Sequence, residues 1–357
     1  MSKLNILHIL PTLSQGGAEK FTLDLCNEYH KDHCVNLMIL YSGGHFDALE
    51  PAIDGPNLHK LHLGGWKKII IPFYILGYLI KNRMNVVHLH LMTPFFCILS
   101  IIFFRHIKFV YTFHGDPSYD NRLVRVSIQL LTLFNNVTFV AVSPSIRKLV
   151  LGMYKGIDVK VVINGASTPS VNERNVALLR NVYSNKKLFL NVARLDNIKN
   201  QLELVLAFRD LPDEYHLLII GGDPSTDYSR TLIFEINKTN NVEYLGFKSC
   251  VGDYIKIADY IIFSSLHEGL PISLIESFSL STPVLCTPIP GLNELISDKK
   301  VGLCFEGFLK EDFVKLLSGI TANNNMSKSL SKNAEDLYRA DFEISIVAAK
   351  YLELYFD

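Results

Sequence analysis

The chain has 357 residues, of which 48% are hydrophobic and 20% are charged, and its 35 Lys and Arg balance its 35 Asp and Glu. A chain of this length predicts about two domains, each with a sizeable hydrophobic core. The composition excludes a disordered or low-complexity protein, and the zero net charge gives no reason to expect nucleic acid as a partner.

Residues 1–168 alternate short β-branched runs with segments of helical periodicity, beginning with a strand over 4–10 and a helix over 16–30. The same pattern predicts further strands at 35–41, 86–90, 109–114, 137–143 and 159–163. Strands that alternate with helices form a mostly parallel sheet that is covered on both faces. We therefore expect a Rossmann-like N-terminal domain over 1–168.

The pattern restarts after a polar stretch at 165–186 and predicts a second Rossmann-like domain over 169–340. Its strands are expected at 188–193, 216–221, 242–247, 260–264 and 283–287. Residues 341–357 form a helix that we expect to pack across the junction of the two domains. Doubly wound sheets bind ligands beyond the carboxyl ends of their strands. An α/β fold with two such domains facing across a cleft would place the site in the loops that follow the strands.

Two apolar segments of the first domain, 69–80 and 91–104, are too short to span a membrane. One interpretation is that both are buried helices. The other starts from residues 1–164, which hold 16 Lys and Arg against 10 Asp and Glu, and predicts a surface that rests on anionic lipid. The cations that flank the segments are Lys67, Lys68, Lys81, Arg83 and Arg105.

The cysteines and the N-terminus bear on where the protein works. The six cysteines include no CxxC pair, and the first eleven residues lack the long apolar region and the cleavage site of a signal peptide. We therefore expect a cytoplasmic protein with reduced thiols, peripheral on the inner face of the cell membrane under the lipid interpretation.

The most specific motif is the segment 268–276, which follows the predicted strand 260–264 directly. Two acids, Glu268 and Glu276, stand at its ends, and Pro271 suits the first turn of a helix. Gly269 and Leu270 would present backbone N–H groups at the helix N-terminus, which suits an anionic group such as a diphosphate. Taken alone, Glu276 could equally be a partner of the helix dipole.

Two cations, Arg194 and Lys199, follow the predicted strand 188–193. Lys199 would lie at the start of a helix, where a cation is unfavourable unless an anion is bound there as well. A guanidinium and an ammonium that converge on a phosphate would stabilise the charge of a departing nucleoside diphosphate. The alternative is a pair of solvated surface cations.

Weaker signals lie at the strand ends of the first domain. Gly16 and Gly17 allow close approach of the backbone to a ligand, and other strand ends supply His114 and Asn164. His88 and His90 alternate onto one face, but no Cys or carboxylate partner is evident, so we interpret them as structural histidines. The sequence contains no Asp-x-Asp, which disfavours diphosphate chemistry through a metal bound by that motif. We expect neither a metal nor a cofactor.

In order and spacing these motifs resemble the GT-B glycosyltransferases of the large retaining group called family 4, and the resemblance covers most of the chain. It implies that the domain over 1–168 binds the acceptor and that the domain over 169–340 binds the nucleotide sugar. It implies that Glu276 binds the ribose of a nucleotide and that Glu268, with the backbone from Gly269 to Pro271, contacts the transferred sugar or its phosphate. Arg194 and Lys199 would hold the diphosphate without a metal. From the other lobe, the resemblance implies roles for Gly16 and Gly17 near donor and acceptor, for His114 at the donor sugar, and for Asn164 in donor binding.

Two details concern the second domain. Ala193 stands where the family often has Gly, a change that should preserve the path of the backbone. Gly221, Gly222 and Asp223 fit the glycine-rich end of the next strand.

The resemblance implies metal-independent transfer of a sugar from a nucleotide sugar with retention at the anomeric carbon, through an oxocarbenium-like state and with no assigned general base. A UDP-sugar is favoured over GDP-mannose, and the acceptor would be a glycan or a lipid-linked oligosaccharide of bacterial surface polysaccharide synthesis, such as capsule or lipopolysaccharide. Two alternatives stay open. A nucleotide-sugar epimerase of GT-B architecture would convert the donor without an acceptor, and a non-enzymatic two-lobed protein would bind a sugar without a nucleotide.

Overall fold

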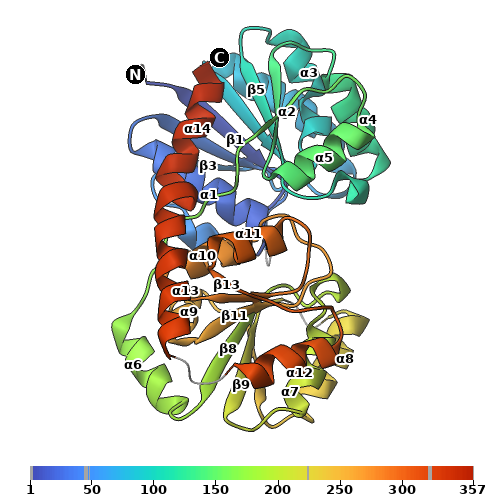
Figure 1. The fold of residues 1–357 in the computed structure, drawn as a ribbon. Helices are drawn as coiled ribbons and strands as arrows, with labels where there is room; N and C mark the ends of the chain where they lie inside the picture. Colours follow the sequence, from blue (N-terminus) through green and yellow to red (C-terminus); the bar gives the residue numbers. More distant parts are fainter. Residues whose placement is uncertain (1–2, 44–46, 48, 223–224, 321–323, 357) are drawn as a thin grey trace. The chain divides into compact units, whose positions relative to one another are not determined.

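The computed structural model describes residues 3–43, 47, 49–222, 225–320 and 324–356. The chain forms two compact units. The first comprises Met1–Ala166 together with Ile344–Asp357, and the second comprises Ser167–Glu343. Each unit is a parallel sheet with helices on both faces (Figure 1). The prediction of two doubly wound α/β domains is therefore confirmed.

The described part of the first unit contains a seven-stranded sheet of order β3-β2-β1-β4-β5-β6-β7. The strands are β1 (Asn5–Leu10), β2 (Cys34–Ile39), β3 (Asn57–Lys60), β4 (Val86–His90), β5 (Lys108–Phe113), β6 (Val137–Ala141) and β7 (Val159–Val161). The helices are α1 (Gly17–His30), α2 (Ile71–Lys81), α3 (Pro94–Phe103), α4 (Arg122–Leu131), α5 (Pro144–Met153) and the C-terminal α14 (Ile344–Phe356). Strand addition reverses between β1 and β4, which makes that pair the switch point where such sheets bind ligands.

The two faces of the first sheet differ in chemistry. Because crossovers between parallel strands are right-handed, α1 covers one face and α2 to α5 cover the other. Odd-numbered strand residues such as Leu7 and Leu89 pack in the apolar core beneath α2, α3 and α4. Helix α14 lies beside α1 (Figure 1), over the face that carries His8, His88 and His90.

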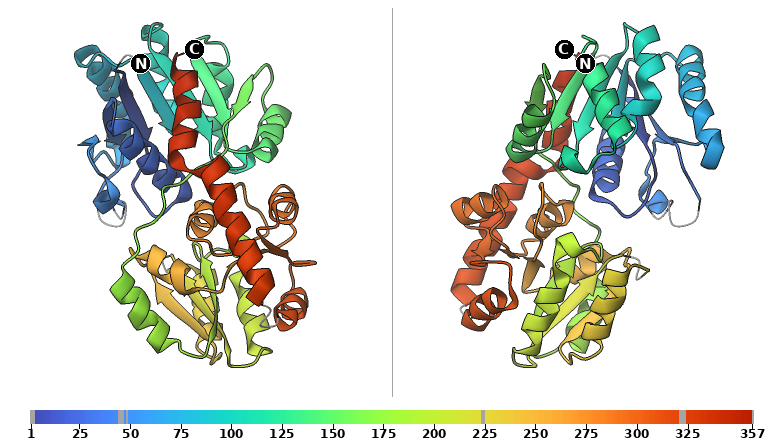
Figure 2. Two further views of the ribbon diagram at one scale, coloured as in Figure 1. Left: turned by 60° about the vertical axis from the view of Figure 1, so that its left-hand side comes forward. Right: turned by 90° about the vertical axis from the view of Figure 1, so that its right-hand side faces the viewer.

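The described part of the second unit contains a six-stranded sheet of order β10-β9-β8-β11-β12-β13. The strands are β8 (Lys187–Val192), β9 (Tyr215–Ile220), β10 (Val242–Gly246), β11 (Tyr260–Phe263), β12 (Val284–Cys286) and β13 (Gly302–Cys304). The helices are α6 (Glu173–Val182), α7 (Gln201–Arg209), α8 (Asp227–Ile236), α9 (Val251–Ile257), α10 (Ile272–Ser279), α11 (Leu292–Lys299), α12 (Lys310–Gly319) and α13 (Asn324–Leu337). Figure 2 shows the helices layered on both sides of this sheet, and its switch point lies between β8 and β11.

All eleven predicted strands lie within two residues of observed ones, whereas two observed strands in the described part of the chain were not predicted. The missed strands are β3 and β13, which form one edge of each sheet. Strand β3 has four residues, among them the polar Asn57 and His59, and β13 has only three residues, so neither shows the continuous apolar run of a buried strand. Pairing with β2 and β12, rather than local pattern, makes them strands.

The apolar segments 69–80 and 91–104 form α2 and α3, and the expectation that they are buried is wrong for one side of each helix. In α2, Ile71, Ile75 and Leu79 are buried, whereas Phe73 and Ile80 are exposed. The end of α3 also exposes Phe103. Both helices therefore carry apolar side chains outward as well as inward.

Candidate functional site

In the second unit, the predicted site residues lie in the loops that follow the two strands of the switch point. Arg194 and Lys199 follow β8, and Glu268 follows β11, which pairs with β8 in parallel. Because both loops leave the same edge of the sheet, residues 69 positions apart in the chain become neighbours. This edge is the candidate site of the second unit.

Lys199 and Glu268 form the central contact of this site. The Nζ atom of Lys199 lies 2.5 Å from Oε1 of Glu268, and Ser265 Oγ donates to the same oxygen at 2.7 Å. Only 18% of the lysine side chain and 10% of the glutamate side chain are exposed. The lysine that was predicted to meet a phosphate is therefore neutralised by a neighbouring carboxylate in the free protein.

Two further hydrogen bonds fix the loops to each other. Ser264 Oγ donates to the backbone oxygen of Lys199 at 2.7 Å, and the backbone N–H of Leu266 donates to the oxygen of Ile198 at 2.7 Å. Asp196 caps the 3₁₀ turn Asn197–Lys199 by accepting from the N–H of Ile198. The Lys199–Glu268 pair is thus built on braced backbone.

Arg194 has an exposed side chain on a fixed backbone. Its carbonyl accepts from the buried Gln201 side chain at 2.8 Å. The end of β9 also approaches this loop closely, because a Cβ added to Gly221 would lie 2.0 Å from the oxygen of Ala193. Glycine is required at 221 for that reason and for its φ of +141°. Asp223, the third residue of the predicted glycine-rich turn, lies outside the described residues.

The segment 269–276 forms the loop and the helix that the motif predicted. Pro271 is the residue immediately before the first turn of α10, with extended backbone (φ −64°, ψ 136°), and Glu276 lies inside the helix. No acidic residue occupies the first turn of α10, so its N-terminal amides remain suited to an anion. Glu276 is buried at 9% exposure and Gly269 is half-buried.

In the first unit, Gly16 and Gly17 stand at the N-terminus of α1, where an acidic side chain folds back over the backbone. A Cβ on Gly16 would lie 2.0 Å from Oε2 of Glu19, and Ser14 Oγ donates to the other oxygen of that carboxylate at 3.0 Å. A ligand at this helix start therefore meets a carboxylate, which suits a sugar hydroxyl better than a phosphate. Asn164 is buried beyond β7, and its backbone N–H donates to the oxygen of Val142.

His114 ends a line of histidines that the sequence revealed only in part. His90 Nδ1 lies 2.9 Å from His114 Nε2, and His90 Nε2 lies 3.1 Å from His8 Nδ1. His88, next to them, bonds Tyr355 through Nδ1 at 2.6 Å and Thr112 through Nε2 at 2.8 Å. Burial lowers the pKa of His8 and of His114 to about 3 and holds the pKa of His88 and His90 well below the usual range, so all four rings are neutral.

The signal for these histidines was present in the sequence. His8 stands in β1 at the position paired with His88 in β4, which the alternation of apolar and polar residues in both strands could have shown. Tyr355 and Tyr351 could not have been found, because α14 is more than 200 residues away in sequence. Ring nitrogens of His8, His88 and His90 lie within 4.8 Å of one another, a spacing that a metal ion could use, but both nitrogens of His88 already have hydrogen-bond partners.

An exposed apolar surface covers the outer side of the first unit along α2. It includes Trp66 and Ile69 in the 3₁₀ segment Gly65–Ile70, then Phe73 and Ile80, with 81%, 72%, 64% and 70% of each residue exposed. Lys67 and Lys68 lie at one end of this surface and Lys81 and Arg83 at the other, all exposed. We call these residues the α2 surface.

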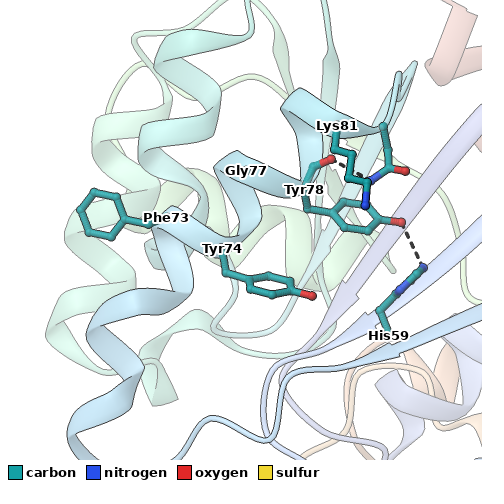
Figure 3. Close-up of a pocket in the computed structure, with 7 residues that line it drawn as sticks. His59, Phe73, Tyr74, Gly77, Tyr78 and Lys81 are labelled. Carbon is teal, nitrogen blue, oxygen red and sulfur yellow. Dashed lines mark hydrogen bonds between the residues drawn. The ribbon is translucent and has the colours of Figure 1, made fainter.

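A hollow of about 460 Å³ lies at the α2 surface, and Figure 3 shows the residues that line it. It is lined by His59, Phe73, Tyr74, Gly77, Tyr78, Lys81 and Asn82, and the Tyr78 hydroxyl lies 3.0 Å from His59 Nε2. Arg105 is the last of the cations predicted to flank the apolar segments. Its guanidinium packs over the Phe134 ring, 4.7 Å from the ring centroid. Within the described residues, no helix is long and apolar enough to cross a membrane.

Comparisons with known proteins agree with this architecture. Residues 15–170 match the model of Glycosyltransferase Family 4, and residues 180–337 match that of Glycosyl transferases group 1. The chain is 30% identical over 177 residues to N-acetylgalactosamine-N,N'-diacetylbacillosaminyl-diphospho-undecaprenol 4-alpha-N-acetylgalactosaminyltransferase of Campylobacter jejuni, a match that covers 49% of this chain and 48% of that protein. It is 23% identical over 309 residues to the capsular polysaccharide biosynthesis glycosyltransferase CapH of Staphylococcus aureus, with 82% and 83% covered.

The fold is shared with a solved structure, that of Anabaena Alr3699/HepE in complex with UDP and glucose. Its TM-score is 0.83 at 16% identity, with 99% of this chain and 100% of that chain covered. The chain spans less than half the length of two relatives at 30% identity or above, 27% of one and 48% of the other. The two family models follow each other along the chain and leave few residues unmatched, so the chain belongs to the family 4 and group 1 glycosyltransferases of GT-B fold.

Proposed function

We propose that this chain transfers a sugar from a nucleotide sugar, with retention at the anomeric carbon and without a metal, to a glycan or lipid-linked oligosaccharide of bacterial surface polysaccharide synthesis. The observation that carries this proposal is the contact of Lys199 with Glu268 at the switch point of the second sheet, where the loop of Lys199 also carries the exposed Arg194. Cations and helix N–H groups at that edge match the charge of a diphosphate.

The chemistry that these groups supply is charge stabilisation. As the bond between the sugar and the diphosphate breaks, negative charge grows on the leaving phosphate and positive charge on the anomeric carbon. Lys199, Arg194 and the N-terminal amides of α10 would stabilise the first of these charges, and the Glu268 carboxylate stands beside Lys199. With two side-chain cations to serve the leaving group, the transfer would need no metal.

Membership of the retaining family supports transfer with retention, and Glu276 in α10 is the residue we assign to the ribose. A UDP-sugar is favoured over GDP-mannose, because the solved structure of the same fold was obtained with UDP and glucose. Gly269, Leu270 and Pro271 would contact the sugar or its phosphate through the backbone.

The acceptor is assigned from the relatives and from the first unit. One relative is named for an undecaprenol-linked acceptor and another for capsular polysaccharide, which supports a lipid-linked glycan. At the start of α1, the Glu19 carboxylate over Gly16, next to Gly17, suits the hydroxyl groups of a glycan. His114 and Asn164 are assigned to the sugar of the donor.

A lipid-linked acceptor requires the enzyme to reach a bilayer, and we assign the α2 surface to that contact. Its apolar residues would enter the boundary of an anionic membrane while Lys67, Lys68, Lys81 and Arg83 meet the phosphates. Arg105 would contribute less, because its guanidinium packs on Phe134. The protein would then work in the cytoplasm, peripheral on the inner face of the cell membrane.

The test is a calorimetric titration of UDP and of GDP, in the presence of a chelator, into the wild-type protein and into Glu276→Ala. We expect specific binding of UDP that the substitution weakens, whereas Glu311→Ala, on the exposed side of α12, leaves it unchanged. Failure of both nucleotides to bind the folded protein would overturn the proposal. Formation of an epimerised donor in the absence of any acceptor would point to an epimerase instead.

A further inference from the structure

Two cysteines lie side by side on the last two strands of the second sheet. Cys286 ends β12 and Cys304 ends β13, and the two residues are partners in the parallel register of these strands. Their Sγ atoms are 3.4 Å apart, and both are free thiols. Neither residue has a part in the proposed transfer. The second unit therefore carries a pair of nucleophilic side chains in van der Waals contact outside the candidate site.

The two thiols differ in their access to solvent. Cys286 is fully buried, whereas Cys304 is half-buried on a strand that has no further neighbour among the described strands. A small reagent therefore reaches Cys304 from solvent. In the folded protein it reaches Cys286 only through the sulfur of Cys304, which touches the sulfur of Cys286.

The contacts of Cys304 favour its thiolate. The pKa of Cys304 is lowered chiefly by its hydrogen bond with Cys286, burial opposes this shift, and a hydrogen bond with Ser297 at 3.5 Å lowers the pKa further. The contact between the sulfurs and burial raise the pKa of Cys286, which therefore keeps its proton. One contact favours the thiol form of Cys304 instead, because the backbone oxygen of Asn293, 3.9 Å from its Sγ, can only accept. Since the thiolate is the nucleophile in disulfide exchange, Cys304 is the more reactive sulfur of the pair.

The strand pairing brings the two residues within the range of a disulfide. Neighbouring strands of a sheet run about 4.8 Å apart, and disulfides join residues whose Cα atoms are about 4.4 to 6.8 Å apart. The two sulfurs must approach from 3.4 Å to a bond length of about 2.05 Å. Because β13 pairs with β12 alone among the described strands, Cys304 can move toward Cys286 without disturbing another strand.

We propose that Cys286 and Cys304 are a modification site, a thiol pair that a low-molecular-weight disulfide oxidises to a disulfide bond within the chain. Cys304 attacks the oxidant, and Cys286 completes the bond. In a reducing compartment such a bond is transient, because an excess of thiol reverses both steps. Neither thiol belongs to the donor site, so the modification does not depend on the proposed function.

Two exchange steps form the bond. In the first, the thiolate of Cys304 attacks one sulfur of the oxidant, a bond forms between these two sulfurs, the S–S bond of the oxidant breaks, and half of the oxidant leaves as a thiolate. In the second, Cys286 gives its proton to the released thiolate, and its sulfur attacks Cys304 and expels the other half of the oxidant. The two cysteines together lose two electrons and two protons, and the oxidant is reduced to two thiols.

The test treats the full chain with oxidised glutathione and maps its peptides by mass spectrometry. In the wild-type protein we expect a bond that joins the peptides of Cys286 and Cys304, with no glutathione left on either, and dithiothreitol should reverse it. Cys286→Ala should stop after the first step, with one glutathione on Cys304. Cys304→Ser should leave Cys286 unmodified. Cys250→Ser is the matched control, because Cys250 is also half-buried in the second unit and its loss should leave the joined pair intact.

A second measurement tests the contact that activates Cys304. Iodoacetamide should alkylate Cys304 about tenfold faster in the wild-type protein than in folded Cys286→Ala at pH 7, because the variant lacks the hydrogen bond between the two sulfurs. The rate at Cys250 reports a general change of access and should be the same in both proteins. An equal or higher rate at Cys304 in Cys286→Ala would overturn its role as the attacking thiolate.

The wild-type protein alone can overturn the proposal, whatever the substitutions do to folding. If the peptides of Cys286 and Cys304 never join, or if glutathione stays bound to Cys304, the two sulfurs do not reach bonding distance and the pair is not a modification site of this kind. The absence of glutathione from Cys304 in folded Cys286→Ala would overturn the order of attack. Thermal unfolding shows which variants are folded.

Discussion

The ammonium of Lys199 lies 2.5 Å from Oε1 of Glu268, although the two residues are 69 positions apart in the chain. Their loops leave adjacent strands, β8 and β11, and are held together by Ser264 and Leu266. The pair is mostly shielded from water, so the free protein holds a cation for a phosphate without leaving an uncompensated charge. Binding of a diphosphate would then rearrange an ion pair that already exists.

Lys199→Ala should lower kcat by about 10²-fold to 10³-fold, because it removes a charge that stabilises the leaving group in the transition state. Stability should fall by about 1 to 3 kcal/mol, since Glu268 keeps only Ser265 as a partner for that oxygen. Steady-state kinetics and urea unfolding measure the two effects separately. Lys238→Ala, whose lysine side chain is 49% exposed on the same unit, serves as the control. Near-normal turnover of Lys199→Ala would exclude Lys199 from the reaction.

Acid should destabilise the first unit through its buried histidines. In an unfolded chain histidine has a pKa of about 6.5, whereas burial depresses the pKa of His8 and of His114 to about 3 and those of His88 and His90 well below the usual range. The unfolded state therefore binds more protons below pH 6.5, and stability is lost as pH falls from there toward the folded values. Four such groups give a limiting slope of roughly 5 kcal/mol per pH unit.

Thermal unfolding at pH 7.5, 6.5, 5.5 and 5.0 checks this expectation. The melting temperature should be flat above pH 7 and fall steeply below 6.5, before most carboxylates titrate. His8→Asn should melt lower at pH 7.5 but show a shallower dependence on pH, because one group of the set is gone. A melting temperature that does not change between pH 7.5 and 5.5 would contradict the neutral state of these rings.

The positions of the site residues could be predicted largely from sequence, whereas their partners could not. Strand-end loops are local patterns, so Arg194, Lys199 and Glu268 were assigned to one edge of a sheet before any contact was known. The contact of Lys199 with Glu268, and the oxygen shared with Ser265, depend on strand order, which periodicity does not report. The carboxylate of Glu19 over Gly16 was missed because a glycine pair suggests space for a ligand rather than for a side chain.

The outward side of α2 shows the same limit of sequence patterns. A continuous run of apolar residues has no alternation of apolar and polar positions, so the sequence does not show which side of the helix is exposed. Segment 69–80 was therefore compatible with full burial. Only the packing of Ile71, Ile75 and Leu79 against the sheet decides which side faces inward. Similarly, His88 and Tyr355 meet because α14 belongs to the first unit.

Trp66 offers a direct test of the α2 surface, because it is the only tryptophan of the chain and is 81% exposed. Vesicles of anionic lipid should shift its fluorescence emission to shorter wavelength at low salt, since the indole would leave water for the boundary of the bilayer. Neutral vesicles and high salt should weaken the shift. Lys67→Glu with Lys68→Glu should abolish it, whereas Lys155→Glu, an exposed lysine beyond α5, should not. If anionic vesicles do not change the emission maximum of Trp66, the assignment of the α2 surface to a membrane would be wrong.

Gly221→Ala adds only a methyl group, but it should strongly disturb the loop that carries Arg194. The new Cβ would lie 2.0 Å from the carbonyl oxygen of Ala193, in a backbone conformation with φ of +141° that side chains rarely adopt. Either β9 or the loop after β8 must move, so we expect a loss of stability above about 2 kcal/mol together with weaker binding of UDP.

Gly246→Ala is the matched control. Its φ is also positive, at +70°, but no atom lies within 4 Å of the new Cβ, so it should cost only about 1 kcal/mol of backbone strain and leave UDP binding intact. Equal effects of the two substitutions on UDP binding would mean that the close approach of Gly221 to Ala193 does not shape the site.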